Sequence, residues 1–234
     1  MPELPDRHAC CRVLELRQYT LHPGGRDTLA SLFEHHFLDA LDETGMHVPG
    51  MFADLDDPDR LVWLRGFPDM ASRHRSLGDF YLTGGVWRAH ARAANATMID
   101  SDDVLLLAPA YVGAGYPARS APRLTAAGRE GQRGHLEIDV VPWSRFETSG
   151  ITPDTLVEHV LTGAATEDAE VVLVATTHPE PNDFEGLPVR DESVAVWLIR
   201  HRDEAARDRL RARLGVGSDD EQVRLGRLVG SQLH

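Results

Sequence analysis

The chain has 234 residues and a formal net charge of −13, with 42% hydrophobic and 26% charged residues. These proportions are ordinary for a globular protein, and the length fits one large domain or two of about 100 residues each. The acidic balance argues against nucleic acid or anionic lipid as a partner, since both attract positive surfaces. No apolar run reaches the roughly 20 residues of a transmembrane helix, and residues 1–8 lack a signal-peptide pattern. We therefore expect a cytoplasmic protein with no nucleic-acid or membrane partner.

The first half of the chain alternates strands and helices. Residues 13–21 alternate as in a strand, a Pro-Gly-Gly turn interrupts them, and 26–43 carry apolar side chains at helical spacing. Two further strands are predicted over 48–55 and 61–67, and helices from Pro68 and over about 86–96. Residues 104–108 complete the set as a fourth strand. The order βαββαβ is that of a ferredoxin-like domain.

The second half repeats this order. After a stretch rich in Ala, Gly, Pro, Ser and Arg, strands are predicted over 135–141, 171–177 and 193–200. Helices are predicted to begin at Thr152 and Asp203, and a short last strand lies within 223–233. We divide the chain into an N-terminal tail (1–11), a first domain (12–110), a linker (111–134) and a second domain (135–234).

The predicted fold class is α+β, with two tandem ferredoxin-like domains packed as a pseudo-dimeric α/β barrel. A four-stranded sheet with helices on one face leaves its other face bare, so two such sheets must cover each other. The two domains of one chain can do this internally. A homodimer in addition to this internal pseudo-dimer is also compatible with the pattern.

Two segments resemble a known family. Residues 15–24 (ELRQYTLHPG), and residues 80–90 (FYLTGGVWRAH) with the following 94–100 and 104–107, are similar to NIPSNAP-family domains. The loop over 179–190 looks like one typical of tandem family members. The resemblance implies the dimeric α/β-barrel fold but no settled reaction. An acidic residue found shortly before Trp87 in other branches of the family is absent here, where Thr83-Gly84-Gly85 stands, which weakens any transfer of polar chemistry to this position.

Several side chains are candidates for binding a ligand. Glu15, Arg17 and Tyr19 share one face of the first strand, where they form either a polar pocket or an ion-pair network inside the barrel or at its rim. His90 is either a core histidine or, by analogy with oxygenase-like folds, part of an aromatic site. The long loop over 179–190 either covers a pocket or is only anchored to the core by Phe184 and Leu187. The candidate ligand-binding residues are Arg17, Tyr19, Trp63, Arg73, Trp87, His90, Asn182 and Arg190.

The sequence predicts no metal site and no cofactor. Cys10 and Cys11 are adjacent and without a CxxC pattern, so we expect neither a disulfide framework nor a zinc site. His35 and His36 point about 100° apart on a helix and have no ligand pattern around them. Nucleotide-binding glycine motifs and serine-hydrolase motifs are also missing.

Two hypotheses for the function follow. The first is a protein that binds a small apolar or aromatic molecule between sheet and helices; its enzymatic version is a cofactor-independent oxygenase or isomerase in bacterial metabolism. The second is a non-catalytic interaction or scaffold protein, as eukaryotic NIPSNAP relatives are mainly discussed. A cavity of a few hundred Å³ with converging polar groups would favour the first hypothesis. A filled cavity and an exposed apolar patch would favour the second.

Overall fold

A computed structural model describes residues 10–113, 116–123, 135–147, 149–167 and 169–233. The beginning of the predicted tail and most of the predicted linker lie outside these residues. The first half contains the strands β1 (Val13–Leu21), β2 (His47–Asp54), β3 (Arg60–Phe67) and β4 (Met98–Val112). Its helices are α1 (Gly25–Leu32), α2 (Leu38–Glu43), α3 (Met70–Leu77) and α4 (Gly85–Asn95), with π-helical segments η1 (Phe33–Phe37) and η2 (Gly78–Thr83) inserted between them.

The second half has the same order of elements. Its strands are β5 (His135–Pro142), β6 (Glu170–Thr177), β7 (Val194–His201) and β8 (Glu221–Arg227). A 3₁₀ turn η4 (Trp143–Arg145) precedes α5 (Pro153–Thr166), and α6 (Glu204–Leu214) follows β7. The predicted caps are present, because the Thr152 and Asp203 side chains accept backbone N–H bonds from Thr155 and Ala206. The predicted order of elements is therefore confirmed in both halves.

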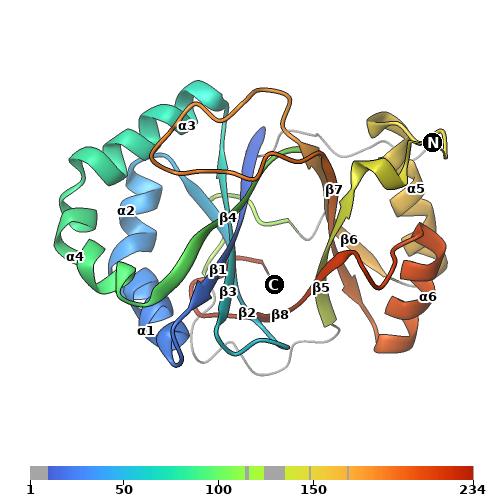
Figure 1. Ribbon diagram of the computed structural model, residues 1–234, viewed down its shortest axis with the longest axis horizontal. Helices are drawn as coiled ribbons and strands as arrows, with labels where there is room; N and C mark the ends of the chain where they lie inside the picture. The colour runs from blue at the N-terminus through green and yellow to red at the C-terminus, as the bar shows by residue number, and fades with distance from the viewer. Residues whose placement is uncertain (1–9, 114–115, 124–134, 148, 168, 234) are drawn as a thin grey trace.

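The eight strands close into a barrel in the order β1-β3-β2-β8-β5-β7-β6-β4. Each half contributes the ferredoxin-like order, and the halves join where β2 pairs with β8 and β4 pairs with β6. In Figure 1 the helices of the first half cover one side of the barrel and those of the second half cover the opposite side. This is the predicted pseudo-dimeric α/β barrel.

The barrel interior is apolar. Leu14 and Leu16 of β1 point inward with Ile138 of β5 and Val196 of β7, and all belong to one buried cluster. Because side chains alternate along a strand, Glu15 and Arg17 face the opposite way, toward the helices. The ion pairs expected inside the barrel or at its rim therefore lie between the sheet and the helices.

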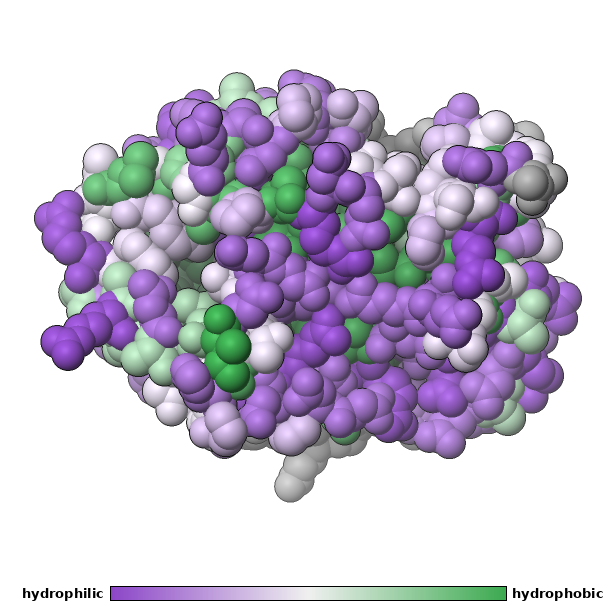
Figure 2. All heavy atoms as spheres, viewed as in Figure 1, coloured by the Kyte–Doolittle hydropathy of each residue, from purple (hydrophilic) through white to green (hydrophobic). Residues whose placement is uncertain are grey.

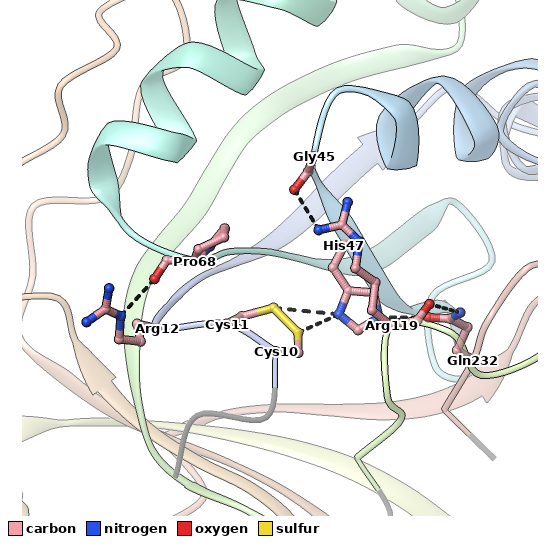
Figure 3. The surroundings of a disulfide bond; sticks show 8 residues. All are labelled: Cys10, Cys11, Arg12, Gly45, His47, Pro68, Arg119 and Gln232. Atoms are coloured by element: carbon pink, nitrogen blue, oxygen red, sulfur yellow. Dashed lines mark hydrogen bonds between the residues drawn. A yellow bond between two sulfur atoms is a disulfide. The ribbon is translucent and has the colours of Figure 1, made fainter. Parts of the chain in front are cut away.

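Cys10 and Cys11 form a disulfide, which contradicts the expectation from the sequence (Figure 3). Adjacent side chains point to opposite faces only within a pleated strand. Both cysteines precede the first residue of β1, and Cys10 lies in a bend, so their side chains turn to the same side.

None of the helices in the described part of the chain is long and apolar enough to cross a bilayer.

Candidate functional site: an aromatic cavity beside buried arginines

An aromatic cavity lies between the sheet and the helices of the first half. Its inner part is narrow, with a volume of about 30 Å³. Two of its walls come from the π-helical segments, which bring Phe33 and Phe37 of η1 and Phe80 and Tyr81 of η2 to face Trp63 of β3. A π turn adds one residue to a helical turn and is frequent at functional sites. The remaining lining residues are Tyr19, Leu29, Leu41, Trp87, Ala94 and Met98.

A wider opening of about 290 Å³ continues this cavity outward. The two spaces share Tyr19, Tyr81, Trp87 and Met98 as walls. The opening also has polar groups that the inner part lacks, above all the Arg17 side chain. Its other lining residues are Leu82, Asn95, Ser101, Phe184, Gly186 and Leu187. An apolar interior with a few polar groups near the mouth is the usual layout of a small-molecule site.

Three arginines surround one carboxylate behind the cavity. Glu15 accepts hydrogen bonds from Arg17 Nη1 at 2.7 Å, Arg65 Nε at 2.6 Å and Arg73 Nε at 2.7 Å. All four side chains are at most 2% exposed. Burial alone would raise the pKa of Glu15, but the three guanidinium groups outweigh it and hold that pKa well below its ordinary value.

The cluster carries more positive than negative charge. Apart from Glu15, the only carboxylate bound to it within the described residues is Asp183, which Arg73 Nη1 contacts at 2.6 Å. Three cations therefore face two anions, and the Nη2 atoms of Arg65 and Arg73 are buried without an acceptor in this part of the structure. Buried charge of one sign favours a compensating charge nearby.

Two tyrosine hydroxyls connect this charge to the cavity. Tyr19 Oη accepts from Arg17 Nε at 2.8 Å, and Tyr81 Oη accepts from Arg65 Nη1 at 3.0 Å. Burial raises the pKa of Tyr19 although Arg17 opposes the shift, so its hydroxyl stays protonated. A hydroxyl whose lone pair is engaged by an arginine still has its proton to donate. Both hydroxyls belong to residues that line the opening and can donate to the oxygen of a bound molecule.

A loop from the second half covers the opening. In Figure 1 the segment between β6 and β7 reaches across the barrel toward α3. It is attached there by Asp183, which binds Arg73, and by Phe184, whose ring lies 5.7 Å from the His74 ring. Phe184 is 8% exposed and forms part of the wall of the opening together with Leu187. The cavity is therefore built by both halves of the chain.

The structure brings four of the sequence-derived candidates together in this site. Arg17, Tyr19, Trp63 and Trp87 line the inner cavity, the opening or both. Arg73 lies behind them and contacts Glu15 and Asp183 instead of the cavity. That any of these five residues contacts a ligand remains a prediction.

The other three candidates lie elsewhere. Asn182 and Arg190 line a separate hollow of about 810 Å³ beneath their own loop. The Asn182 amide donates to the Phe184 and Leu187 carbonyls and so shapes the loop. Arg190 binds acidic groups on three segments, Asp103, Glu192 and Glu221. His90 does not line the aromatic cavity: it stacks on His36 with ring centroids 3.9 Å apart and meets the lining residue Phe37 edge-on at 6.2 Å.

Sequence reasoning missed Tyr81, Phe33, Phe37 and Arg65. Phe33 and Phe37 fall within the helix predicted over 26–43, because a spacing of four residues also fits one face of an ordinary α-helix. Arg65 could have been found from strand pairing, since it lies directly opposite Glu15 in the register of β1 and β3. Oppositely charged residues facing each other across two strands commonly pair.

Solved structures of the same fold cover nearly the whole chain. A protein from Fusobacterium nucleatum, provisionally named a monooxygenase, is 9% identical with a TM-score of 0.55 and covers 94% of each chain. An anthrone oxidase-like protein is 10% identical with a TM-score of 0.53, and the match covers 96% of this chain and 92% of the other. At these identities the similarity establishes the fold.

A NIPSNAP family protein from Agrobacterium tumefaciens is also among the similar structures. It is 16% identical with a TM-score of 0.41, and the match covers 46% of this chain and 93% of the other. No protein-family profile matches the chain. No curated protein matches it by sequence either.

Proposed function

We propose that the protein binds a small aromatic molecule that carries an ionisable oxygen, with its ring in the wider opening and its oxygen at Tyr19 and Tyr81. The observation that carries this proposal is that each of these hydroxyls accepts a hydrogen bond from a buried arginine. Two oriented O–H donors next to an excess of positive charge would stabilise a phenolate or enolate more than the neutral form. The aromatic walls supply apolar contact for the ring.

The same arrangement supports a cofactor-independent oxygenase. An enolate or phenolate is electron-rich enough to react with O₂ directly, and the site would favour that anion. Oxidation of a ring methylene would consume one O₂ and give the ketone and one water, R₂CH₂ + O₂ → R₂C=O + H₂O. The electrons come from the substrate, so the balance requires no further reductant. Similar structures named as a monooxygenase and as anthrone oxidase-like support this choice of reaction.

Binding can be tested with 4-nitrophenol, whose phenol and phenolate forms absorb at different wavelengths. At a pH where the free dye is mostly the phenol, we expect saturable binding that increases the phenolate absorbance. Replacing Tyr19 or Tyr81 by Phe should weaken binding about 10-fold or more, since a hydrogen bond to a charged group contributes about 1.5–3 kcal/mol. Tyr111→Phe is the matched control, because Tyr111 packs against the core of the second half.

Binding of the dye as the neutral phenol, or equal binding by all variants, would refute the proposed site. Catalysis is a separate measurement. Oxygen uptake in the presence of anthrone should be faster with the wild-type protein than with Tyr19→Phe or Tyr81→Phe. If the dye binds as proposed but no tested methylene substrate consumes O₂, the protein is a binding protein and not an oxygenase of this class.

The interaction hypothesis has weaker support. The exposed large apolar side chains in the described ranges are Leu55, Leu82, Val86 and Ile99. At the junction of these two elements, Leu82 lies near the end of η2 and Val86 near the start of α4, with extended backbone at Gly84 between them. Figure 2 shows a mainly hydrophilic face with isolated apolar groups. A specific interface needs about 800 Å² per partner. If a homodimer forms through this junction, Val86→Glu should yield monomers by light scattering without changing dye binding.

A further inference from the structure

The Cys10–Cys11 pair faces a histidine that comes from a distant part of the chain. β1 and β2 both run antiparallel to β3, so they are parallel to each other and begin at the same end of the sheet. The cysteines precede β1 and His47 is the first residue of β2. As a result His47 Nδ1 lies 2.6 Å from Cys10 Sγ and 3.6 Å from Cys11 Sγ (Figure 3).

A hydrogen-bond chain determines which nitrogen of His47 carries the proton. The Gln232 amide nitrogen donates to the carbonyl oxygens of Arg119 at 3.2 Å and Ala121 at 2.6 Å. This fixes the orientation of the amide, so its oxygen, 2.7 Å from His47 Nε2, must accept a proton from the ring. The Nδ1 atom then has a free lone pair directed at the two sulfur atoms.

The disulfide does not satisfy this lone pair. Sulfur atoms bonded to each other carry no proton, so neither can donate a hydrogen bond to Nδ1. His47 is 1% exposed and Cys11 5% exposed, so water does not readily take this role. An imidazole lone pair and two sulfurs that converge in a buried place, with the other ring nitrogen held by an amide oxygen, match the donor set and outer contact of a metal-binding histidine.

The surrounding chain makes room for the sulfur atoms. Gly66 of β3 lies opposite His47 in the sheet, and a Cβ atom at Gly66 would lie 2.4 Å from Cys11 Sγ. Any side chain here would therefore displace the sulfur. Cys10 is half-buried, which leaves a route for an ion from the surface. The three ligand atoms already lie within 4.8 Å of one another.

We propose that Cys10, Cys11 and His47 bind one thiophilic ion such as Zn²⁺ when the disulfide is reduced, and that the disulfide form does not bind it. Two thiolates and one imidazole suit Zn²⁺ and leave its fourth position for water or another ligand. The sulfur atoms must separate to about 3.7 Å to coordinate at the usual Zn–S distance of about 2.3 Å. Rotation of the two cysteine side chains after reduction provides this separation.

The redox step balances with a phosphine as reductant. The phosphine gives two electrons to the S–S bond and takes the oxygen of one water molecule, and the two protons of that water go to the two sulfurs. The products are a phosphine oxide and two thiols. Binding of Zn²⁺ then displaces the two thiol protons, so the site with its ion has no net charge from metal and thiolates.

The experiment compares the full chain in two redox states. Protein reduced with a phosphine and desalted without oxygen should bind one Zn²⁺ per chain by calorimetry, and the oxidised protein none. Co²⁺ in place of Zn²⁺ should give sulfur-to-metal charge-transfer and tetrahedral absorption bands. Cys10→Ser and Cys11→Ser should each weaken binding at least about 10-fold, and Gln232→Leu, which loosens the histidine, by about 10-fold.

Tyr116→Phe is the matched control, because the Tyr116 ring contacts His47 edge-on at 6.4 Å and has no ligand atom in the cluster. It should bind Zn²⁺ like the wild type. Circular dichroism confirms that each variant is folded, and a thiol assay confirms two free thiols in the reduced protein. A folded, fully reduced protein that binds no Zn²⁺ would overturn the proposal. Equal binding by the oxidised protein or by both serine variants would overturn it as well.

Discussion

The two halves of the barrel share one scaffold but differ in the charge of the side chains at equivalent positions. In the first half Glu15 pairs in register with Arg65, and Arg17 with Trp63. At the same positions of the second half, Glu137 faces Ile199 and Asp139 faces Trp197. Thus Arg17 corresponds to Asp139, and each lies opposite a tryptophan. The first half gathers three arginines around a carboxylate, and the second gathers two carboxylates below the arginines of α6.

This difference in charge shifts the pKa values of the buried carboxyl groups in opposite directions in the two halves. The arginines keep Glu15 ionised, with a lowered pKa. In the second half the nearest guanidinium atoms are 3.6–4.0 Å from the carboxylates. Burial raises the pKa of Glu137 to about 7, with Asp139 adding to the effect, and raises that of Asp139 to about 6. One fold therefore holds one half with an excess of buried arginines and one half whose buried carboxyl groups favour the protonated form.

The largest expected effect is loss of the Glu15 carboxylate. Glu15→Gln leaves three buried guanidinium groups with Asp183 as their one counter-ion among the described residues. Breaking a buried pair in this way costs about 3–5 kcal/mol. Urea unfolding should show this decrease in the free energy of unfolding. The control is Asp56→Asn, which breaks an exposed pair with Arg224 and should cost less than about 1 kcal/mol. If both variants lost the same free energy of unfolding, the buried Glu15 cluster would contribute no more to stability than the exposed Asp56–Arg224 pair.

In the second half we expect removal of the buried carboxylates to stabilise the protein, whereas Glu15→Gln destabilises it. An acid whose pKa is raised by folding binds more protons in the native state, so stability falls as the pH rises from about 4 to about 7. The double variant with Glu137→Gln and Asp139→Asn removes this contribution. Its free energy of unfolding should exceed that of the wild type by an amount that grows between about pH 5 and pH 8, to about 2–4 kcal/mol.

His201 lies in the same half and also makes the stability depend on pH. Burial lowers its pKa to about 4, with Arg207 and Arg211 adding to the effect, so it destabilises the native state at acid pH. It is present in both proteins and cancels in their difference. A difference that stays constant from pH 5 to pH 8 would show that Glu137 and Asp139 do not titrate on folding.

The alternation of the strands and the caps of the helices were readable from the sequence, since they depend on neighbouring residues. The limits of β4 were not, because Met98–Val112 includes acidic residues that favour a turn by themselves. The pairing of β4 with β1 and β6 extends it on both sides of the predicted 104–108. The π-helical walls of the cavity were also missed, because apolar residues four apart, such as Phe33 and Phe37, also fit one face of an ordinary α-helix.

The cysteine site shows a different limit. Cys10 and His47 are 37 residues apart, and no spacing rule connects them. The predicted strand order did contain the signal, because parallel β1 and β2 must begin at the same end of the sheet. The side chain that orients His47, Gln232, comes from near the other end of the chain. Its position follows only from the closure of the barrel.

The smallest expected effect is a difference in the free energy of unfolding between the Phe variants of the two equivalent tryptophans, Trp63 and Trp197. Trp197 Nε1 donates to Asp139 at 2.8 Å, whereas Trp63 Nε1 is buried without an acceptor in the described structure and its ring borders the cavity. Replacement by Phe removes similar volume at both positions but a hydrogen bond only at Trp197. We expect Trp197→Phe to lower the free energy of unfolding by about 1 kcal/mol more than Trp63→Phe. Above pH 7 the gap should widen, because the ionised Asp139 then depends most on this donor. A larger loss for Trp63→Phe would indicate that the indole of the first half is a structural anchor and that the cavity it borders is not kept open for a ligand.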